Sequence, residues 1–331
     1  MKFRKLVVLV MMSMLLVACG TKKEDGASTE KTNANEVSTE SSNKKVGVIQ
    51  LADHIALERA RLGFEEELKK TNPDVEIITK NANGDLTVVP QIIKSFSDQN
   101  VDLIYAIATP AAQGAKNAEK DIPIIFNAVT DPVTSDLVEN IESPEANVTG
   151  VSDYFSMAAQ LEEMIDIFPD VKNIGVMFST NESNSKFQIE ELKKAASDFG
   201  LEVVEVGVNN INDVSTAIKT LEPKMDIFMA ITDNTISSAS SIIAESLKQA
   251  NIPSFASEEG PVENGILLSL GVDYTKLGEE AATIADEILK GKKVNEIPVL
   301  FPTEARKVVN KDTAEALKIE NEKLFENAEV K

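Results

Sequence analysis

The stretch KKVGVIQL (Lys44–Leu51) returns as KNIGVMFS (Lys172–Ser179), 128 residues further along the chain. Two later pairs follow in the same order, at offsets of 124 and 130: DLIYAIAT (102–109) with DIFMAITD (226–233), and DIPIIF (121–126) with NIPSFA (251–256). Chance similarity among apolar segments can explain one such pair, but three ordered pairs indicate an internal repeat. The sequence therefore predicts two similar lobes.

Short apolar runs alternate with amphipathic helical patterns throughout both halves. We expect strands at 46–51, 75–79, 103–107, 122–126, 174–178, 202–206 and 226–231. We expect helices near 55–70, 87–99, 111–120, 156–168, 184–199, 211–221, 234–249 and 274–290. A strand followed by a helix, repeated, predicts an α/β fold with parallel sheets that are covered by helices on both faces. A chain of 331 residues has room for two such domains.

Composition excludes several classes of function. With 43% hydrophobic and 26% charged residues the chain is typical of globular proteins, and its net charge of -21 repels nucleic acid. One His and one Cys make a zinc site implausible, and we expect no metal and no cofactor. The chain has no G-x-G-x-x-G, P-loop or G-x-S-x-G motif, so we predict that it is not an enzyme.

The first eighteen residues read as a signal peptide. Three basic residues precede an apolar run, Leu6–Ala18, of about 20 Å as a helix, which is shorter than the roughly 30 Å hydrocarbon core. The residues Leu16-Val17-Ala18-Cys19 resemble the lipobox of bacterial lipoproteins, which implies that Cys19 carries a lipid. We therefore expect a lipid-anchored protein on the extracytoplasmic face of the membrane, with 30 basic and 54 acidic side chains left after cleavage, or -24.

Residues 19–44 are expected to form a disordered tether. The segment 20–44 has no aromatic residue and a single large aliphatic one, Val37, so it cannot bury enough apolar surface to order itself. The tether is either a spacer that lifts the folded body off the membrane or merely a disordered terminus.

Small polar residues gather where the expected strands end. The carboxyl ends of parallel strands meet at one edge of a sheet, where loops lead into helix N-termini and ligands bind. In the first lobe these ends are 50–54, 109–111 and 127–131, and in the second they are 179–185, 232–235 and 257–260. Two lobes that face each other with such loops predict a cleft for a small polar molecule.

Several of these segments resemble the substrate-binding lipoproteins of ABC importers that serve aromatic amino acids. The resemblance lies in ATPAAQ (108–113), AVTDPV (128–133), NVTGVSD (147–153), ESNS (182–185) and DNT (233–235). It implies a type I periplasmic-binding-protein fold, with two Rossmann-like lobes and hinge crossings near 148–152, 270–273 and 297–302. We place the first lobe at 45–149 plus 273–297 and the second at 150–272 plus 298–331.

The physical chemistry of these loops suggests how a substrate binds. Thr109 opens a helix with a Pro after it, which suits a substrate carboxylate, although Thr109 can also be a plain cap. For the ammonium we favour Asp233 and then Asp131, and each can instead be a cap or turn residue. The expected ligand-binding residues are Gln50, Asp53, Thr109, Ala111, Asp131, Tyr154, Glu182, Asn184, Ser185, Asp233, Asn234 and Glu258.

The sequence also suggests roles for the aromatic residues, the single histidine and an acidic pair near these loops. Tyr154 follows the first crossing and is the aromatic residue best placed for the cleft wall, whereas Phe126 and Phe178 lie on strands and should be core. The lone His54 is more typical of a surface or capping residue. The acidic pair Glu258–Glu259 departs from the family pattern, which leaves the polarity of the pocket wall open.

We predict a monomeric lipoprotein that captures an amino acid, with Trp, Tyr or Phe as the candidates, and delivers it to the membrane permease of an ABC importer. Capture would shift a hinge equilibrium rather than drive chemistry. The alternative is a surface lipoprotein that acts as an adhesin or ligand sensor on the same fold.

Overall fold

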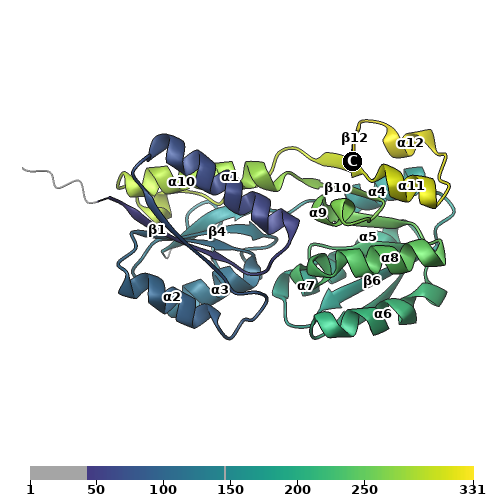
Figure 1. Ribbon diagram of the computed structural model, residues 1–331, viewed down its shortest axis with the longest axis horizontal. Helices are drawn as coiled ribbons and strands as arrows, with labels where there is room; N and C mark the ends of the chain where they lie inside the picture. Colours follow the sequence, from purple (N-terminus) through teal and green to yellow (C-terminus); the bar gives the residue numbers. More distant parts are fainter. Residues whose placement is uncertain (1–42, 145–146) are drawn as a thin grey trace, which may run out of the picture. The chain divides into compact units, whose positions relative to one another are not determined.

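The computed structural model describes residues 43–144 and 147–331. The signal peptide, Cys19 and nearly all of the expected tether lie outside these residues. The described chain contains two sheets, one of five strands and one of seven, each flanked by helices (Figure 1). The expected α/β fold with two parallel-sheet lobes is confirmed.

The first sheet is parallel throughout and has the order β2-β1-β3-β4-β5. Its strands are β1 (Lys45–Gln50), β2 (Glu76–Asn81), β3 (Leu103–Ile107), β4 (Ile124–Val129) and β5 (Val148–Ser152). Its connecting helices are α1 (Ile55–Thr71), α2 (Val89–Asp98) and α3 (Thr109–Ala118). The strands β1, β3, β4 and β5 are almost continuously buried and apolar, as strands covered on both faces must be.

The second sheet has the order β12-β11-β10-β9-β8-β6-β7. Its parallel part consists of β6 (Asn173–Ser179), β7 (Glu202–Val208), β8 (Ile227–Ala230), β9 (Ser254–Glu258) and β10 (Leu268–Val272). The strand β11 (Arg306–Val309) pairs antiparallel with β10, and β12 (Ala328–Val330) pairs parallel with β11. The strands expected from the sequence do not include β9, β10, β11 and β12, nor β5 of the first sheet. Strands β5 and β10 lie where crossings between the lobes were expected, and β11 and β12 are short and alternate with no long helix.

Helices α4 (Met157–Ile167), α5 (Ser183–Asp198), α6 (Val214–Leu221), α7 (Asn234–Ser238), α8 (Ser240–Ala250) and α9 (Gly260–Glu263) flank the second sheet, with α11 (Lys311–Ala316) and α12 (Glu322–Phe325) near its end. The described residues also form 3-10 turns at Ile211–Asp213, Glu222–Lys224 and Val294–Glu296. Two expected helices differ in detail. The one at 211–221 opens as a 3-10 turn, and the one at 234–249 breaks at Ala239 into α7 and α8.

The internal repeat is visible in the pairing of the strands. In the first sheet β1 lies between β2 and β3, and in the second β6 lies between β7 and β8. Asp102 and Asp226, which the sequence match aligns, both accept backbone N–H groups at the start of the central strand, from Lys45 at 2.9 Å and from Asn173 at 2.8 Å. The repeat therefore extends to individual side-chain contacts.

The chain passes between the two sheets three times. It leaves the first sheet after β5, returns after β10 into α10 (Tyr274–Leu289), and leaves again before β11. The boundary that we expected at 149/150 falls inside β5, whose five residues form one strand beside β4. Likewise Leu300, expected in the second lobe, bonds to β5 through its backbone N–H to Gly150 at 2.9 Å. The other lobe boundaries stay a prediction.

Helix α10 lies along α1 (Figure 1), and two glycines allow the close approach. A Cβ on Gly63 would be 2.4 Å from the carbonyl oxygen of Thr275, and one on Gly278 would be 2.2 Å from that of Ala60.

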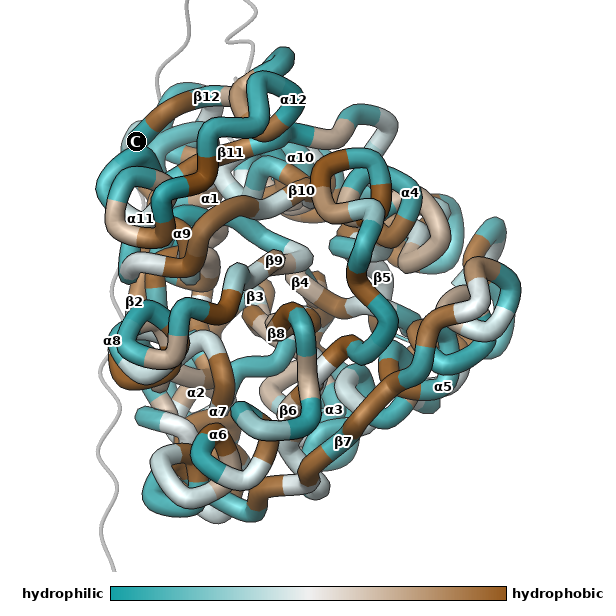
Figure 2. The backbone as a smooth tube through the Cα atoms, turned by 90° about the vertical axis from the view of Figure 1, so that its right-hand side faces the viewer, coloured by the Kyte–Doolittle hydropathy of each residue, from teal (hydrophilic) through white to brown (hydrophobic). Residues whose placement is uncertain are grey.

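Buried apolar side chains of the described residues form one cluster in the first lobe and two in the second. In Figure 2, where the tube is coloured by residue hydropathy, hydrophobic residues appear at strands such as β3, β4 and β8.

Candidate functional site

A small polar cavity lies where the strand-end loops of the two lobes meet. His54, Leu57 and Ala128 line it from the first lobe, and Asp153 and Tyr274 line it from the segments that cross between lobes. The second lobe adds Asn184, Thr232, Asp233, Asn234, Ser237 and Glu258. We call this the inner cavity. Its volume of about 10 Å³ is enough for roughly one water molecule.

The Asp233 carboxylate is held inside the second lobe. Its Oδ1 caps helix α7 by accepting the Ile236 N–H at 2.9 Å. Its Oδ2 accepts the Ser179 N–H at 2.5 Å and the Ser185 hydroxyl at 2.7 Å. Three hydrogen bonds thus engage both oxygens, and they tie the end of β6 to the starts of α5 and α7.

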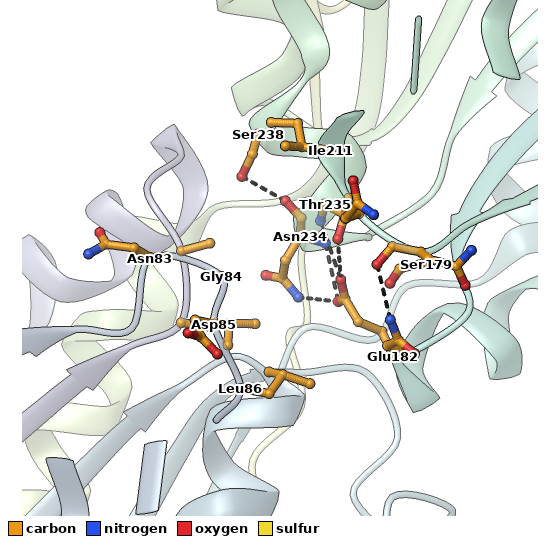
Figure 3. Close-up of a pocket in the computed structure, with 15 residues that line it drawn as sticks. Asn83, Gly84, Asp85, Leu86, Ser179, Glu182, Ile211, Asn234, Thr235 and Ser238 are labelled. Carbon is orange, nitrogen blue, oxygen red and sulfur yellow. Dashed lines mark hydrogen bonds between the residues drawn. The ribbon is translucent and has the colours of Figure 1, made fainter. Parts of the chain in front are cut away.

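The Glu182 carboxylate is engaged in the same way. It accepts the Asn234 side-chain amide at 2.5 Å and the Thr235 hydroxyl at 3.2 Å, and backbone N–H groups of both residues lie 3.3 Å away. Figure 3 shows Glu182 pointing toward Asn234 and Thr235. Glu182 and Asp233 therefore build one side of the site through contacts within the second lobe.

Two carboxyl groups beside the inner cavity are strongly perturbed. Burial, and secondarily the charge of Glu182, raises the pKa of Asp233 to about 7. Burial also raises the pKa of Glu258 to about 7, although Glu258 accepts the Gly260 N–H and the Ser237 hydroxyl. Both side chains are only 1% exposed, so little water solvates their charged forms.

Three buried acceptor atoms in the inner cavity have no hydrogen-bond partner among the described residues: Asp153 Oδ1, Asn184 Oδ1 and His54 Nδ1. The other ends of these side chains are engaged. Asp153 Oδ2 accepts the Tyr274 hydroxyl at 2.7 Å, and Asn184 Nδ2 donates to the Thr232 carbonyl at 3.0 Å. Buried polar atoms are normally paired, so three unpaired acceptors around one cavity indicate a ligand with donors.

The His54 ring is a neutral acceptor at its Nδ1. Burial lowers the pKa of His54 to about 4, against smaller opposing effects of Asn234 and Asp53. His54 Nε2 lies 3.2 Å from Asn234 Oδ1. Because Asn234 uses its amide group to bond Glu182, its Oδ1 is the acceptor, so Nε2 carries the ring proton. His54, Asn234 and Glu182 thus connect the two lobes beside the inner cavity.

Two alanines near the cavity have positive φ angles. Ala108 has a φ of 84° and Ala128 a φ of 56°, which residues with a Cβ seldom adopt. Asn127 stabilises the second turn, since its Oδ1 accepts the Ala128 N–H at 2.7 Å. Such backbone strain clusters at binding sites. Directly after Ala108, Thr109 begins α3, and its buried hydroxyl has no partner among the residues that the structure describes.

A second, larger cavity of about 420 Å³ shares the lining residue Asn234 with the inner one. Figure 3 shows the residues that line this larger cavity. We call it the outer cavity. Corresponding loops of the two lobes line it, 83–86 after β2 and 209–211 after β7. Leu86 and Ile211 are exposed on these loops, at 39% and 45%. The outer cavity is therefore both larger and less polar at its rim than the inner one.

The structure brings together only part of the expected ligand-binding set. Asn184, Asp233, Asn234 and Glu258 line the inner cavity, Glu182 lines the outer one, and Ser185 supports Asp233. Ala111 is buried in α3 close behind Thr109.

The other expected residues have local contacts. Gln50 donates to the Ala52 carbonyl at 2.8 Å, and Asp53 is exposed. Asp131 accepts the N–H groups of Val133 and Thr134, which is the turn role that we had left open. The Tyr154 hydroxyl donates to Glu191 at 2.9 Å. None of these four lines the inner cavity.

Sequence reasoning missed Asp153, Tyr274 and the role of His54. Asp153 ends the segment NVTGVSD, whose resemblance to the family was noted, so a signal for it was present. Tyr274 carries no comparable signal, because its side chain reaches Asp153 only through the second crossing between the lobes.

Two parallel-sheet lobes with polar strand-end loops around an inner cavity define a two-lobed solute-binding protein. The chain belongs to the family of ABC transporter substrate-binding proteins, which it matches over residues 45–331. Proteins of this family act outside the cytoplasm and bind a small molecule for an ABC transporter. No helix in the described residues is both long and apolar enough to cross a membrane.

Relatives with known ligands resemble nearly the whole chain. A tyrosine-binding protein from Clostridioides difficile is 39% identical over 96% of this chain and 93% of its own length. The ABC domain from Streptococcus pneumonia in complex with L-Trp is 34% identical, covers 87% of this chain and 99% of its own, and superposes with a TM-score of 0.84.

A third relative was solved in a different state. It is the ligand-free, open structure of a substrate-binding protein with adhesive properties from Clostridium difficile, 39% identical over 87% of this chain and 99% of its own. Its TM-score is 0.67, lower than that of the L-Trp complex although its sequence is more similar. The lobes of this chain are therefore arranged more like those of the ligand-bound relative.

We predict a pH-dependent effect of Glu258→Gln on stability. A carboxyl with a raised pKa favours folding in its protonated form, so its contribution is complete at low pH and is lost as the pH rises through about 7. The variant cannot ionise at this position. Its free energy of unfolding, relative to that of the wild type, should therefore be higher at pH 8 than at pH 5 by about 1–3 kcal/mol. Urea unfolding at both pH values measures this difference, and a pH-independent difference would contradict it.

Proposed function

We propose that this protein captures an L-amino acid with an aromatic side chain between its lobes and delivers it to the permease of an ABC importer. The three unpaired acceptors of the inner cavity carry the proposal. An ammonium group has three N–H donors, and Asp153, Asn184 and His54 present one free acceptor each. Burial raises the pKa of Asp153, and an ammonium group beside it would favour the charged carboxylate, so that the contact would be stronger than a neutral one.

The start of helix α3 suits the carboxylate of the same amino acid. The Thr109 hydroxyl is a free donor there, and the N-terminus of a ten-residue helix attracts negative charge. In this arrangement Asp233, Glu182 and Ser185 position the binding residues, because their polar groups are already engaged. This assignment replaces Asp233 by Asp153 as the preferred partner of the ammonium.

Capture requires the lobes to move. An inner cavity of about 10 Å³ cannot hold an amino acid, so the ligand enters when the lobes separate, and in the loaded form the loops around the cavity stand further apart than in the arrangement described here. The tyrosine-binding and L-Trp-bound relatives support an aromatic side chain. We expect a monomer and no catalytic activity, since hinge closure on the ligand is the function.

Calorimetric titration of residues 42–331 tests the function. We expect L-Tyr, L-Trp or L-Phe to bind, and tyramine and 3-(4-hydroxyphenyl)propionate, which lack the carboxylate and the ammonium respectively, to bind far more weakly. A ligand at a hundredfold excess over its Kd should stabilise the fold by about 2.7 kcal/mol. If no aromatic amino acid binds, the proposal is wrong.

Asp153→Asn tests the ammonium contact. The variant keeps the shape of the side chain and an oxygen for the Tyr274 hydroxyl but removes the charge, so affinity for the amino acid should fall by about 2–5 kcal/mol. The affinity for 3-(4-hydroxyphenyl)propionate should not fall, because that molecule has no ammonium. Asp312→Asn, at an exposed position on α11, is the matched control. Equal losses for both ligands would argue against this role of Asp153.

We also propose that the lipid on Cys19 anchors the protein to the membrane. The support is the sequence: a short apolar leader, a lipobox-like segment and the only Cys of the chain at its end. The polar residues between Cys19 and β1 would then separate the folded body from the bilayer.

Cys19→Ser should prevent attachment of the lipid, because the variant has no thiol to carry it. The N-terminal peptide of the wild type should carry a lipid, whereas the variant should carry none and should either keep its apolar leader or, if the leader is cut, appear in the medium. Fractionation of expressing bacterial cells, followed by mass spectrometry of the N-terminal peptide, measures the outcome. Wild-type protein that carries no lipid would exclude the anchor.

A further inference from the structure

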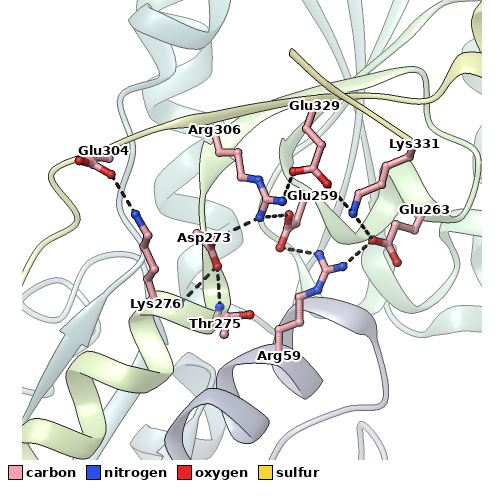
Figure 4. A network of polar contacts seen from close by, with 10 residues as sticks. All are labelled: Arg59, Glu259, Glu263, Asp273, Thr275, Lys276, Glu304, Arg306, Glu329 and Lys331. Atoms are coloured by element: carbon pink, nitrogen blue, oxygen red, sulfur yellow. Dashed lines mark hydrogen bonds and ion pairs between the residues drawn. The ribbon is translucent and has the colours of Figure 1, made fainter. Parts of the chain in front are cut away.

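The acidic pair Glu258–Glu259 divides between two different environments. Glu258 faces the inner cavity, whereas Glu259 lies in a network of charged side chains outside it (Figure 4). Glu259 is 3% exposed, and burial raises its pKa even though two arginines oppose this effect. A carboxylate in such a place is costly unless opposite charges stay beside it.

The two arginines come from different parts of the fold. Arg59, on α1 of the first lobe, lies with its Nη1 2.5 Å from Glu259 Oε1. Arg306, on β11 of the second sheet, lies with its Nη1 3.0 Å from Glu259 Oε2. Arg59 also pairs through Nη2 with Glu263 of α9 at 2.5 Å. One guanidinium of the first lobe thus holds two carboxylates of the second.

The remaining contacts keep this part of the second lobe in place without Arg59. Arg306 pairs with Asp273 at 3.1 Å and with Glu329, and Lys331 pairs with Glu329 at 2.7 Å and with Glu263 at 3.4 Å. Glu259 and Glu263 therefore each keep one cationic partner if the Arg59 contact is broken. The acceptors of Arg59 would therefore stay organised if the lobes separated and the Arg59 contact broke.

We infer that Arg59 is a positioning residue for ligand capture: it joins α1 to α9 across the two lobes and favours their closed arrangement. The expected effect of Arg59 on ligand affinity rests on the proposed function. A ligand that needs the closed form binds with an apparent Kd equal to the intrinsic Kd divided by the closed fraction. Loss of the Arg59 contact should lower that fraction.

Arg61 provides a matched control on the same helix. Its guanidinium pairs with Glu58 and Glu65, all within α1, and its side chain is 17% exposed compared with 23% for Arg59. Arg61→Gln therefore removes the same charge and a comparable pair of contacts without affecting the contact between the lobes.

The test compares Arg59→Gln with Arg61→Gln in residues 42–331. Arg59→Gln should weaken binding of the aromatic amino acid by about fivefold or more, mainly through faster dissociation, and Arg61→Gln should not. The affinity of Arg59→Lys should lie between those of the wild type and Arg59→Gln, because one ammonium cannot pair with two carboxylates as the forked guanidinium does. Small-angle X-ray scattering without ligand should give a larger radius of gyration for Arg59→Gln than for wild type or Arg61→Gln.

A merely structural role would lower the unfolding midpoint of Arg59→Gln but leave the radius of gyration and the affinity at their Arg61→Gln values, and that result would overturn the inference. If the wild type binds no aromatic amino acid, the proposed function fails. The ligand-free scattering comparison still decides the role of Arg59 in that case, since it needs no ligand.

Discussion

The parallel pairing of β1 with β3 and of β6 with β8 is the constraint on which the rest of the structure depends. Parallel strands all end at the same edge, so every loop that follows a strand meets the loops after its neighbours. Because the chain repeats this arrangement in two lobes, two sets of polar loops surround the inner cavity. The same repeat places corresponding loops on both sides of the outer cavity.

Burial of acidic side chains between these loops determines the character of the site. Glu182 and Asp233 obtain their hydrogen bonds from helix starts and side chains of their own lobe, so they are structural supports. Asp153 is different, because only one of its oxygens has a partner among the described residues. Asp153 thus differs from the two supporting carboxylates in keeping one oxygen available for a further contact.

Polar and ionic contacts between the lobes stabilise the closed arrangement independently of any ligand. The pair of His54 and Asn234 connects the lobes beside the inner cavity, and Arg59 with Glu259 connects them at the charged network. Neither pair has to contact a ligand in order to affect its affinity, because affinity depends on the closed fraction as well as on contacts. The superposition on the ligand-bound relative fits lobes that are held together by such contacts.

Local patterns in the sequence predicted the two lobes, seven of the strands and most of the longer helices, because alternation of apolar runs and repeated segments need no knowledge of distant contacts. They also singled out Asn184, Asp233 and Asn234, which lie where loops after strands lead into helices. Only the tertiary structure decided the unpaired oxygen of Asp153, the place of His54 beside the inner cavity, the antiparallel strand β11 and the different surroundings of Glu258 and Glu259. Each depends on partners far away in sequence, such as Tyr274 for Asp153 and Arg59 for Glu259, and no local pattern encodes such contacts.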